Sequence, residues 1–154
     1  MTTSLTLAEL ESAAGRELGT SDWHEITQAQ IDKFADATGD HQWIHVDPDA
    51  AANGPFGTTV AHGYLTLSML PMLVSELVSV SDAVMGINYG MEKMRFTNPV
   101  PSGSRVRLHA KLVRAERRGP GVLWTVGVEV EVEGKEKPAL VGEVVYMAAG
   151  APDA

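Results

Sequence analysis

Polar and apolar residues alternate along two segments in the C-terminal third of the chain. Val106, Leu108 and Ala110 are separated by charged or polar residues, and residues 122–133 alternate valines with polar and acidic positions. A period of two is typical of strands with one buried and one solvated face. It predicts an antiparallel meander of four long strands, at residues 84–96, 104–116, 122–133 and 139–148.

The segment before these strands has a different pattern. Residues 61–80 are apolar on nearly every side of a helix, which indicates a helix surrounded by protein. Pro71 predicts a kink or break within it. His62, Ser75 and Glu76 make the run too polar for a membrane span, which needs about 20 mostly apolar residues.

The N-terminal part reads as short elements. Thr6 with Glu9 and Thr27 with Gln30 have the spacing of capping boxes, so each pair predicts the start of a helix. Gly39 is expected to end the second helix in the left-handed conformation. Residues 23–26 predict a short strand, and residues 40–59 show no period, so we expect a functional loop there.

These elements together predict an α+β fold. A sheet with one apolar face must be covered, and the helix at 61–80 is the element long and apolar enough to cover it. We therefore expect an antiparallel sheet wrapped around a central helix. The length of 154 residues suits a single domain, spanning 1–154.

The amino-acid composition excludes several kinds of site and partner. The chain has no cysteine, which excludes disulfides, thiolate metal ligands and a cysteine nucleophile. Its net charge of −8 argues against a nucleic-acid partner. The start of the chain lacks the basic residues of a signal peptide, so we expect a cytoplasmic protein with no membrane partner.

The candidate chemistry lies in the segment Gly39-Asp40-His41-Gln42-Trp43-Ile44-His45. Asp40 and His45 are a carboxylate and an imidazole five residues apart, and such a pair can hold one water and move a proton. The alternative is that Asp40 caps a turn while His45 satisfies a backbone carbonyl.

His62 and Gly63 stand where the apolar helix is expected to begin. The free N–H groups of a first helical turn carry the positive end of the helix dipole, and a glycine lets a ligand approach them closely. For Gly63 taken alone we favour a packing role where helix and sheet come close, and for His62 we favour a structural hydrogen bond. A metal site built from Asp40, His41, His45 and His62 is a weaker reading, and no serine-hydrolase elbow is present.

Taken together, these motifs resemble the MaoC-like dehydratases, (R)-specific enoyl-CoA hydratases with a hotdog fold. The resemblance covers nearly the whole chain, and proteins of the NodN-like subgroup look closer still. The family motif runs Gly-Asp-x-Asn-Pro-(Ile/Leu)-His followed by x-Asp, and this chain keeps Gly39, Asp40, Ile44, His45 and Asp47. It departs at Gln42 and Trp43, where the family usually has Asn-Pro, but the Asp–His spacing survives.

The resemblance implies a reaction and a set of roles. Water would add syn to a trans-2-enoyl thioester, with Asp40 as the acid–base, His45 orienting the water and the Gly63 N–H polarising the carbonyl. It implies no cofactor and no metal, an enoyl-CoA or enoyl-acyl-carrier-protein substrate, and a homodimer joined edge to edge. The candidate substrate-binding residues are Trp43, His62, Tyr64, Asn88 and Arg95. Trp43, Tyr64, Met69 and Met72 could line an acyl tunnel, although such residues are more often core.

Two other functions stay open. A hotdog thioesterase would need a carboxylate within the central helix, and the candidate is Glu76 near its end. A non-catalytic acyl-thioester-binding subunit of a dehydratase complex would not need both Asp40 and His45.

A basic stretch at residues 93–118 carries a net charge of +7 and suggests a site for the phosphates of CoA. If residues 104–133 form a hairpin, however, Arg105 faces Glu133, Arg107 faces Glu131 and His109 faces Glu129. We therefore expect a self-neutralised sheet face. The basic residues expected to lack such partners are Lys93, Arg95, Arg114, Arg117 and Arg118, with Arg95 the favoured phosphate candidate.

Overall fold

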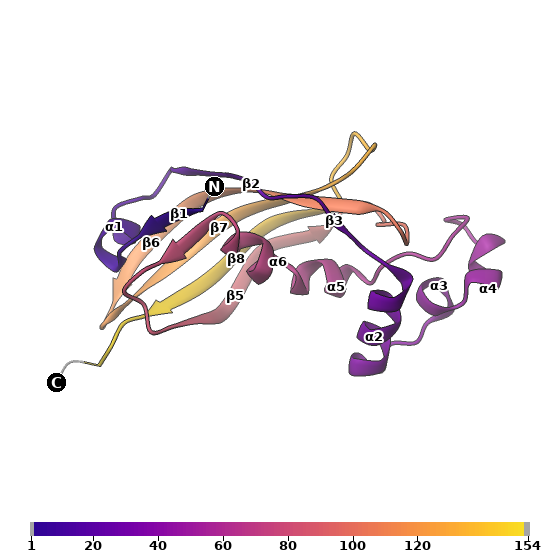
Figure 1. Cartoon of the computed structure of the whole chain (residues 1–154), viewed down its shortest axis with the longest axis horizontal. Helices are drawn as coiled ribbons and strands as arrows, with labels where there is room; N and C mark the ends of the chain where they lie inside the picture. Colours follow the sequence, from indigo (N-terminus) through magenta and orange to yellow (C-terminus); the bar gives the residue numbers. More distant parts are fainter. Residues whose placement is uncertain (1, 153–154) are drawn as a thin grey trace.

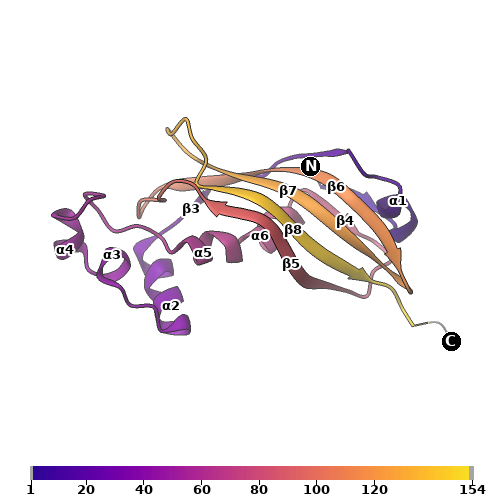
Figure 2. The same cartoon turned by 180° about the vertical axis from the view of Figure 1, so that it is seen from behind.

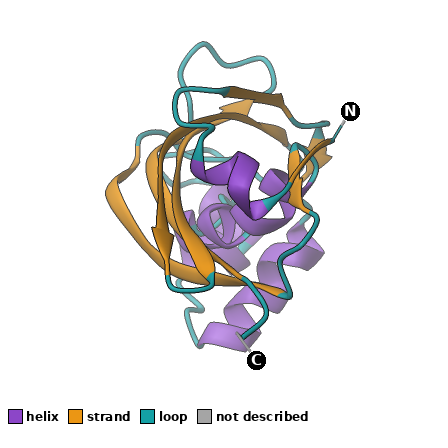
Figure 3. Cartoon of the chain, turned by 90° about the vertical axis from the view of Figure 1, so that its left-hand side faces the viewer, coloured by secondary structure: helices purple, strands orange, loops and turns teal. Residues whose placement is uncertain are grey.

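An antiparallel sheet curves around two short helices in the computed structural model, which describes residues 2–152 (Figures 1 and 3). The strands of this sheet are β2 (Glu17–Thr20), β3 (His24–Glu25), β5 (Met85–Phe96), β6 (Arg105–Arg118), β7 (Gly121–Val132) and β8 (Leu140–Ala149). The strand order is β2-β6-β7-β8-β5, with β3 pairing along β6 as well. The four long strands predicted from alternation are confirmed to within two residues at each end.

The predicted four-strand meander is wrong at its first strand. β6, β7 and β8 do form a meander, but β5 pairs with β8 at the far edge of the sheet (Figure 2). The connection between β5 and β6 crosses the end of the sheet, where Pro101 forms an isolated bridge to Val60. It is too long for the tight two-residue loop that joins adjacent strands in a hairpin, so β5 and β6 need not be neighbours.

Two helices, α5 (Gly63–Ser68) and α6 (Leu70–Ser75), replace the single helix predicted at 61–80. Pro71 lies in the first turn of α6, where its missing N–H leaves no intrahelical hydrogen bond unmade. Beyond α6 the chain forms β4 (Val78–Val80), which pairs in parallel with β1 (Thr3–Leu5). The break predicted from Pro71 is therefore confirmed, whereas the change to a strand at β4 was not predicted.

Helices α5 and α6 are buried only on the side that faces the sheet. Leu65, Leu70 and Leu73 pack into the core against the concave face of the sheet, whereas Tyr64 is 65% and Met72 42% exposed. The expectation of a helix surrounded by protein is therefore wrong for this chain, because no described element covers the outer side of α5 and α6.

The predicted capping residues do begin helices. α1 (Leu7–Glu11) has the full capping box, with Glu9 N–H donating to Thr6 Oγ1 and Thr6 N–H donating to Glu9 Oε2. α2 (Gln28–Thr38) has only the first of these bonds, from Gln30 N–H to Thr27 Oγ1. α2 ends at Gly39, which is left-handed at φ 82° as predicted.

The segment expected to be a loop, residues 40–59, contains two short helices, α3 (Trp43–Val46) and α4 (Pro48–Ala52). Asp47 and Pro48 lie in this expected loop and are residue types common in turns, but they begin α4. Asp47 accepts a hydrogen bond from Ala50 N–H, and Pro48 occupies the first helical position. Turn and helix-start signals use the same residue types, which explains the error.

The charged face of β6 and β7 is largely self-neutralised. Arg105 pairs with Glu133 and Arg107 with Glu131, as predicted. His109 lies opposite Glu129 in the register but hydrogen-bonds Glu131, a diagonal neighbour, at 2.6 Å.

Three basic residues expected to lack acidic partners have them. Arg114 bonds Glu92 and Glu143, Arg117 bonds Glu11, and Arg118 bonds Glu116. The partners of Arg114 and Arg117 come from other elements, which the register of one hairpin could not reveal. No helix of the described chain is long and apolar enough to cross a membrane.

Candidate active site

Helices α2, α3 and α4 gather at one end of the sheet, beside the start of α5 (Figures 1 and 2). This arrangement brings His62 to the pair formed by Asp40 and His45. A carboxylate oxygen of Asp40 and ring nitrogens of His45 and His62 all lie within 4.8 Å of one another.

His45 is held in one tautomer. It lies in α3, is 7% exposed, and its Nδ1 is 2.7 Å from the carbonyl oxygen of Val60. A carbonyl can only accept, so Nδ1 carries the proton and donates. In the neutral ring Nε2 is then a free acceptor. The expected carbonyl contact of His45 is therefore present, and it leaves the second ring nitrogen available for chemistry.

His62 supports both neighbours from behind. Its Nε2 donates to the backbone oxygen of Asp40 at 2.9 Å, and its ring stacks on His45 with centroids 3.8 Å apart. Phe34 contacts the ring at a centroid distance of 4.9 Å. His62 is only 2% exposed, so it lies behind the site and contacts its neighbours rather than solvent.

Asp40 follows the left-handed Gly39 that ends α2, so its side chain projects from a tight turn. The carboxylate is about half exposed, with a side-chain accessibility of 52%, and it accepts a weak 3.4 Å bond from Gln42 N–H. The carboxylate therefore faces solvent while its backbone is anchored by His62. This exposure is what a group that exchanges protons with a water or substrate needs.

Gly63 opens α5, so its N–H is one of the first-turn donors without an intrahelical acceptor. The ring of Phe96 covers this position, because a Cβ added at Gly63 would lie 2.8 Å from Phe96 Cγ. A side chain at residue 63 would thus collide with Phe96. A cavity of about 310 Å³ reaches Gly63 and Phe96 from outside.

Gln28 is a residue that the sequence analysis missed. Its amide donates to the carbonyl of His45 at 2.7 Å and to Asp32 Oδ1 at 2.9 Å, and its oxygen accepts from Thr59 Oγ1 at 2.5 Å. It links α2 to α3 and to the segment that bonds His45. In the sequence, Gln28 is a polar residue in the first turn of a predicted helix. Polar residues are common at that position, so nothing marked Gln28 as part of the site.

His41, the fourth residue of the metal hypothesis, lies outside this cluster. His41 is exposed and bonds Asp36 at 2.9 Å, and this carboxylate raises the pKa of His41 above its ordinary value. The rings of His45 and His62 are stacked at an interplanar angle of 22°. Stacked rings direct their lone pairs along nearly parallel planes rather than toward one ion, an arrangement that disfavours joint metal ligation.

The remaining predicted substrate-binding residues are spread more widely. Trp43 is 43% exposed and packs over Gly54, where an added Cβ would lie 2.8 Å from its ring. Tyr64 packs edge-on against Phe96 at 5.5 Å. Arg95 donates to the carbonyl of its neighbour Met94.

The four residues predicted to line an acyl tunnel or the core differ in burial. Trp43, Tyr64 and Met72 are too exposed to be core residues, whereas Met69 is buried.

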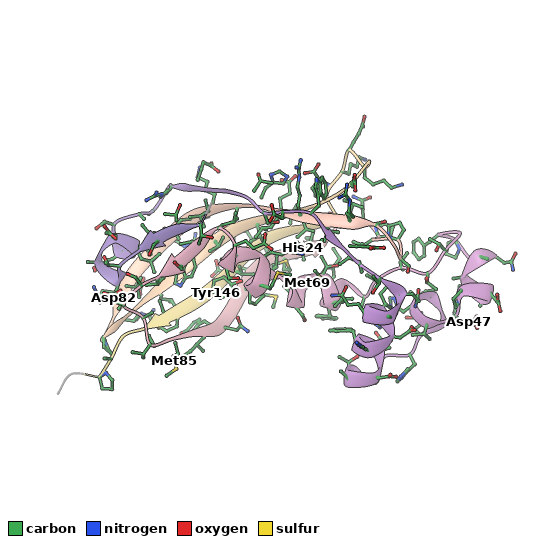
Figure 4. The ribbon with its side chains drawn as sticks, in the orientation of Figure 1. His24, Asp47, Met69, Asp82, Met85 and Tyr146 are labelled. Carbon is green, nitrogen blue, oxygen red and sulfur yellow. The ribbon has the colours of Figure 1, made fainter. Side chains whose placement is uncertain are left out.

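Asn88 lies on β5 and lines two adjoining cavities of about 400 and 320 Å³ between the helices and the sheet. Tyr146 and Pro71 also line both cavities. Tyr146 lies beside α6, far from the end of the molecule that carries Asp47 (Figure 4). Burial raises the pKa of Tyr146 to about 12, so its hydroxyl stays protonated at neutral pH.

Two proteins are similar in sequence to this chain over most of its length. The 3-hydroxyacyl-thioester dehydratase Z of Mycobacterium tuberculosis is 53% identical over 146 residues, covering 94% of this chain and 97% of that protein. Nodulation protein N of Rhizobium leguminosarum is 48% identical over 139 residues, covering 88% and 86%.

Solved structures agree on the fold. An R-hydratase of Pseudomonas aeruginosa superposes with a TM-score of 0.75 at 23% identity, covering 96% of this chain and 87% of that one. An (R)-hydratase of A. caviae gives a TM-score of 0.70 at 22% identity, covering 86% and 94%. The hotdog fold expected from the sequence is confirmed.

A family model described as the MaoC like domain matches residues 9–135. This range includes Asp40, His45, His62 and Gly63, the residues that meet beside the start of α5. The chain therefore belongs to the family of MaoC-like dehydratases.

Proposed function

We propose that this protein is an (R)-specific enoyl thioester hydratase of the hydratase 2 type, a hydro-lyase that also catalyses the reverse dehydration. The observation that carries the proposal is the meeting of the Asp40 carboxylate and the His45 ring with His62, the residue directly before Gly63 and its free first-turn N–H. The names of the relatives from Mycobacterium tuberculosis and Pseudomonas aeruginosa support it.

The geometry suits a single water. Because His45 Nδ1 is committed to Val60, its Nε2 can accept one hydrogen of the water while Asp40 accepts the other. The water oxygen then keeps a lone pair for attack on C3 of a trans-2-enoyl thioester. As the C–O bond forms, the water proton passes to Asp40 and the carbonyl oxygen becomes an enolate oxygen held by the Gly63 N–H.

Collapse of the enolate completes the addition. Protonated Asp40 returns a proton to C2 from the face on which water attacked, so the addition is syn and gives the (3R)-hydroxyacyl thioester. Every atom comes from water, the thioester and Asp40, so the proposed reaction uses no cofactor and no metal. His62 does not exchange a proton in this scheme; it positions Asp40 and His45.

The acyl chain has an apolar route away from this site. The cavity of about 400 Å³ begins at Leu67, one turn beyond Gly63, and continues past Tyr146 into the cavity of about 320 Å³ beside Val74. Burial of methylene groups along such walls favours binding by about 0.8 kcal/mol per CH₂. We assign this groove to the acyl group.

A homodimer is the proposed assembly. β5 pairs with β8 along one edge only, and its exposed side chains include Met85, Ile87, Tyr89 and Met91. A long apolar edge strand is open to pairing with another chain, and a two-fold axis lets β5 pair with its own copy.

Hydration of crotonyl-CoA, followed as loss of the enoyl absorbance, tests the proposal. Asp40→Asn and His45→Gln should each lower turnover by roughly 10²–10⁴-fold, the usual contribution of a general acid–base, with unchanged circular dichroism. Asp49→Asn and His41→Gln are matched controls, because both side chains are exposed and lie outside the group that meets at Gly63. Chiral analysis of the product should find the (3R) form.

The two alternative functions, a thioesterase and a non-catalytic binding subunit, predict different results in this assay. A thioesterase would release free thiol, but its candidate carboxylate, Glu76, hydrogen-bonds His24 and Asp22 N–H at the other end of the paired helices. A non-catalytic subunit would bind acyl-CoA without turnover. Turnover near the wild-type rate in Asp40→Asn would contradict the proposal.

A further inference from the structure

The cavity that Gly63 and Phe96 line extends beyond these two residues. It shares Phe56, Val60, Asn98 and Pro99 with a second cavity of about 480 Å³. The far wall of the second cavity is the turn between β7 and β8, including Lys135 and Lys137. The two cavities thus form one groove, which runs from the proposed oxyanion N–H to two lysines.

The turn that carries the lysines is held in place. Its backbone closes through Lys135 N–H to the Val132 carbonyl, with Gly134 at φ 78°. The carbonyl of Pro138 accepts bonds from Thr97 Oγ1 at 2.6 Å and Asn98 Nδ2 at 2.8 Å. These bonds fasten the turn to the segment that follows β5, so the lysines lie at a defined place beside the groove. The turn stands out at the end of the sheet near α2–α4 (Figures 1 and 2).

The charge of this turn is available to a ligand. Six of the basic residues form ion pairs with carboxylates, whereas neither Lys135 nor Lys137 does so within residues 2–152. Glu136 lies between them, so residues 135–137 carry a net charge of +1 in a chain whose total is −8. The other carboxylate of the turn, Glu133, is paired with Arg105. The stretch at 93–118, by contrast, is mostly neutralised by its own carboxylates.

We propose that Lys135 and Lys137 bind the phosphate at the far end of the pantetheine arm of the thioester substrate. This inference rests on the proposed function. The thioester carbonyl would lie at Gly63, the acyl chain would run along α5 and α6, and the arm would leave through the groove past Phe56 and Asn98. Lysine is a compact point charge that binds phosphate well. The phosphate belongs either to CoA or to the prosthetic arm of an acyl carrier protein.

The test compares substrates with and without phosphate. The double variant Lys135→Gln/Lys137→Gln should raise KM for crotonyl-CoA roughly tenfold, the effect of losing one or two charge-assisted contacts, with kcat unchanged. With crotonyl-N-acetylcysteamine, which has the thioester but no phosphate, kcat/KM should equal that of wild type. Arg16→Gln/Lys33→Gln removes the same charge from exposed positions away from the groove and should leave both substrates unaffected.

A parallel measurement with crotonyl-acyl carrier protein identifies the source of the phosphate. A rise of KM with crotonyl-CoA alone assigns the lysines to the nucleotide phosphates, and a rise with both substrates assigns them to the phosphate that both arms share. An unchanged KM for both, or an equal loss with the N-acetylcysteamine thioester, would overturn the inference.

Failure of the proposed function would look different, because wild-type protein would then turn over neither thioester. Binding of free CoA, measured by calorimetry on wild type and on both double variants, reports on the lysines without any turnover. Weaker binding in Lys135→Gln/Lys137→Gln alone is the expected result.

Discussion

The residues proposed to react are held by neighbours that do not react themselves. His45 is oriented by the Val60 carbonyl in front and by the ring of His62 behind. The backbone of Asp40 is anchored by His62 Nε2. Catalytic side chains need this kind of support, because a displacement of about 1 Å can cost 10²-fold in rate.

Gln28 extends this support, and its removal provides a test. Gln28→Leu would leave the His45 carbonyl and the Thr59 hydroxyl without their partner. We expect kcat to fall at least tenfold with KM nearly constant, and the free energy of unfolding to fall by about 1–3 kcal/mol. Enoyl hydration kinetics and urea denaturation measure the two effects.

Gln30→Leu is the matched control on the same helix, because within residues 2–152 the side chain of Gln30 makes one hydrogen bond, a long one of 3.8 Å to Met69 Sδ. A Gln28→Leu protein that is destabilised but has normal kcat would show that Gln28 is structural and does not position His45.

At the scale of elements, the β6–β7 hairpin places two basic side chains around the carboxylate of Glu131. Arg107 donates to Glu131 at 2.7 Å and lies over the ring of Trp23, and His109 donates to the same carboxylate. The hydrogen bond from Arg107, followed by that from His109, holds the pKa of Glu131 below its usual value. Glu129, which faces His109 in the register, makes no such bond among the described residues.

This lowered pKa gives a stability prediction with a definite sign. The ionised form of Glu131 is favoured by folding, so its contribution is present above the ordinary carboxyl pKa and lost as pH falls through the folded value. Glu131→Gln should lower the free energy of unfolding at pH 7 by about 1 kcal/mol. The difference from wild type should shrink as pH falls below the ordinary carboxyl pKa and vanish once pH is below the lowered pKa of folded Glu131.

Urea denaturation across this pH range measures the effect. Glu129→Gln, on the same strand, should change the stability much less at every pH. Equal losses from the two substitutions would contradict the network and support the simple register pairing instead.

The central helix is the element that sequence reasoning described least well. Hydrophobicity indicated burial but contained no sign of the end of α6 or of β4 beyond it. Pro71 was correctly interpreted as a break, because proline cannot donate the helical hydrogen bond. The strand at Val78–Val80 exists because β1 lies beside it, and that partner is some 75 residues away in the sequence.

At the scale of the whole molecule, apolar surface is concentrated at β5. Met85, Ile87, Tyr89 and Met91 are each between 44% and 58% exposed, which is unusual for large hydrophobic side chains on one strand. The proposed two-fold pairing of β5 would cover them. It would also close the side of the acyl groove that Asn88 and Met91 line.

Charged residues at this edge should separate the subunits. Wild type is expected to sediment as a dimer, and Ile87→Lys/Met91→Lys as a monomer with the same circular dichroism, because like charges would face each other across the two-fold axis. Enoyl hydration should fall with dissociation, since the groove loses one wall. Ala50→Lys on the exposed side of α4 is the control. A wild-type protein that sediments as an active monomer would contradict the proposed assembly.

The sequence by itself determined the four long strands, the start of α1 and the start and end of α2, and the α+β class. These features depend on local rules, namely side-chain alternation, capping spacing and the freedom of glycine at positive φ. It also indicated the pairing of Arg107 with Glu131, because the register of a hairpin follows from its turn. The Asp40–His45 spacing and the family motif indicated the candidate catalytic residues.

Only the tertiary structure decided what depends on contacts between distant segments. It placed β5 beside β8, brought His62 behind Asp40 and His45, and made Gln28 part of the same unit. It also supplied Arg114 with Glu92 and Glu143, so a residue expected to lack acidic partners is neutralised. No local pattern encodes these contacts, because each depends on how the chain closes on itself when its apolar faces are buried.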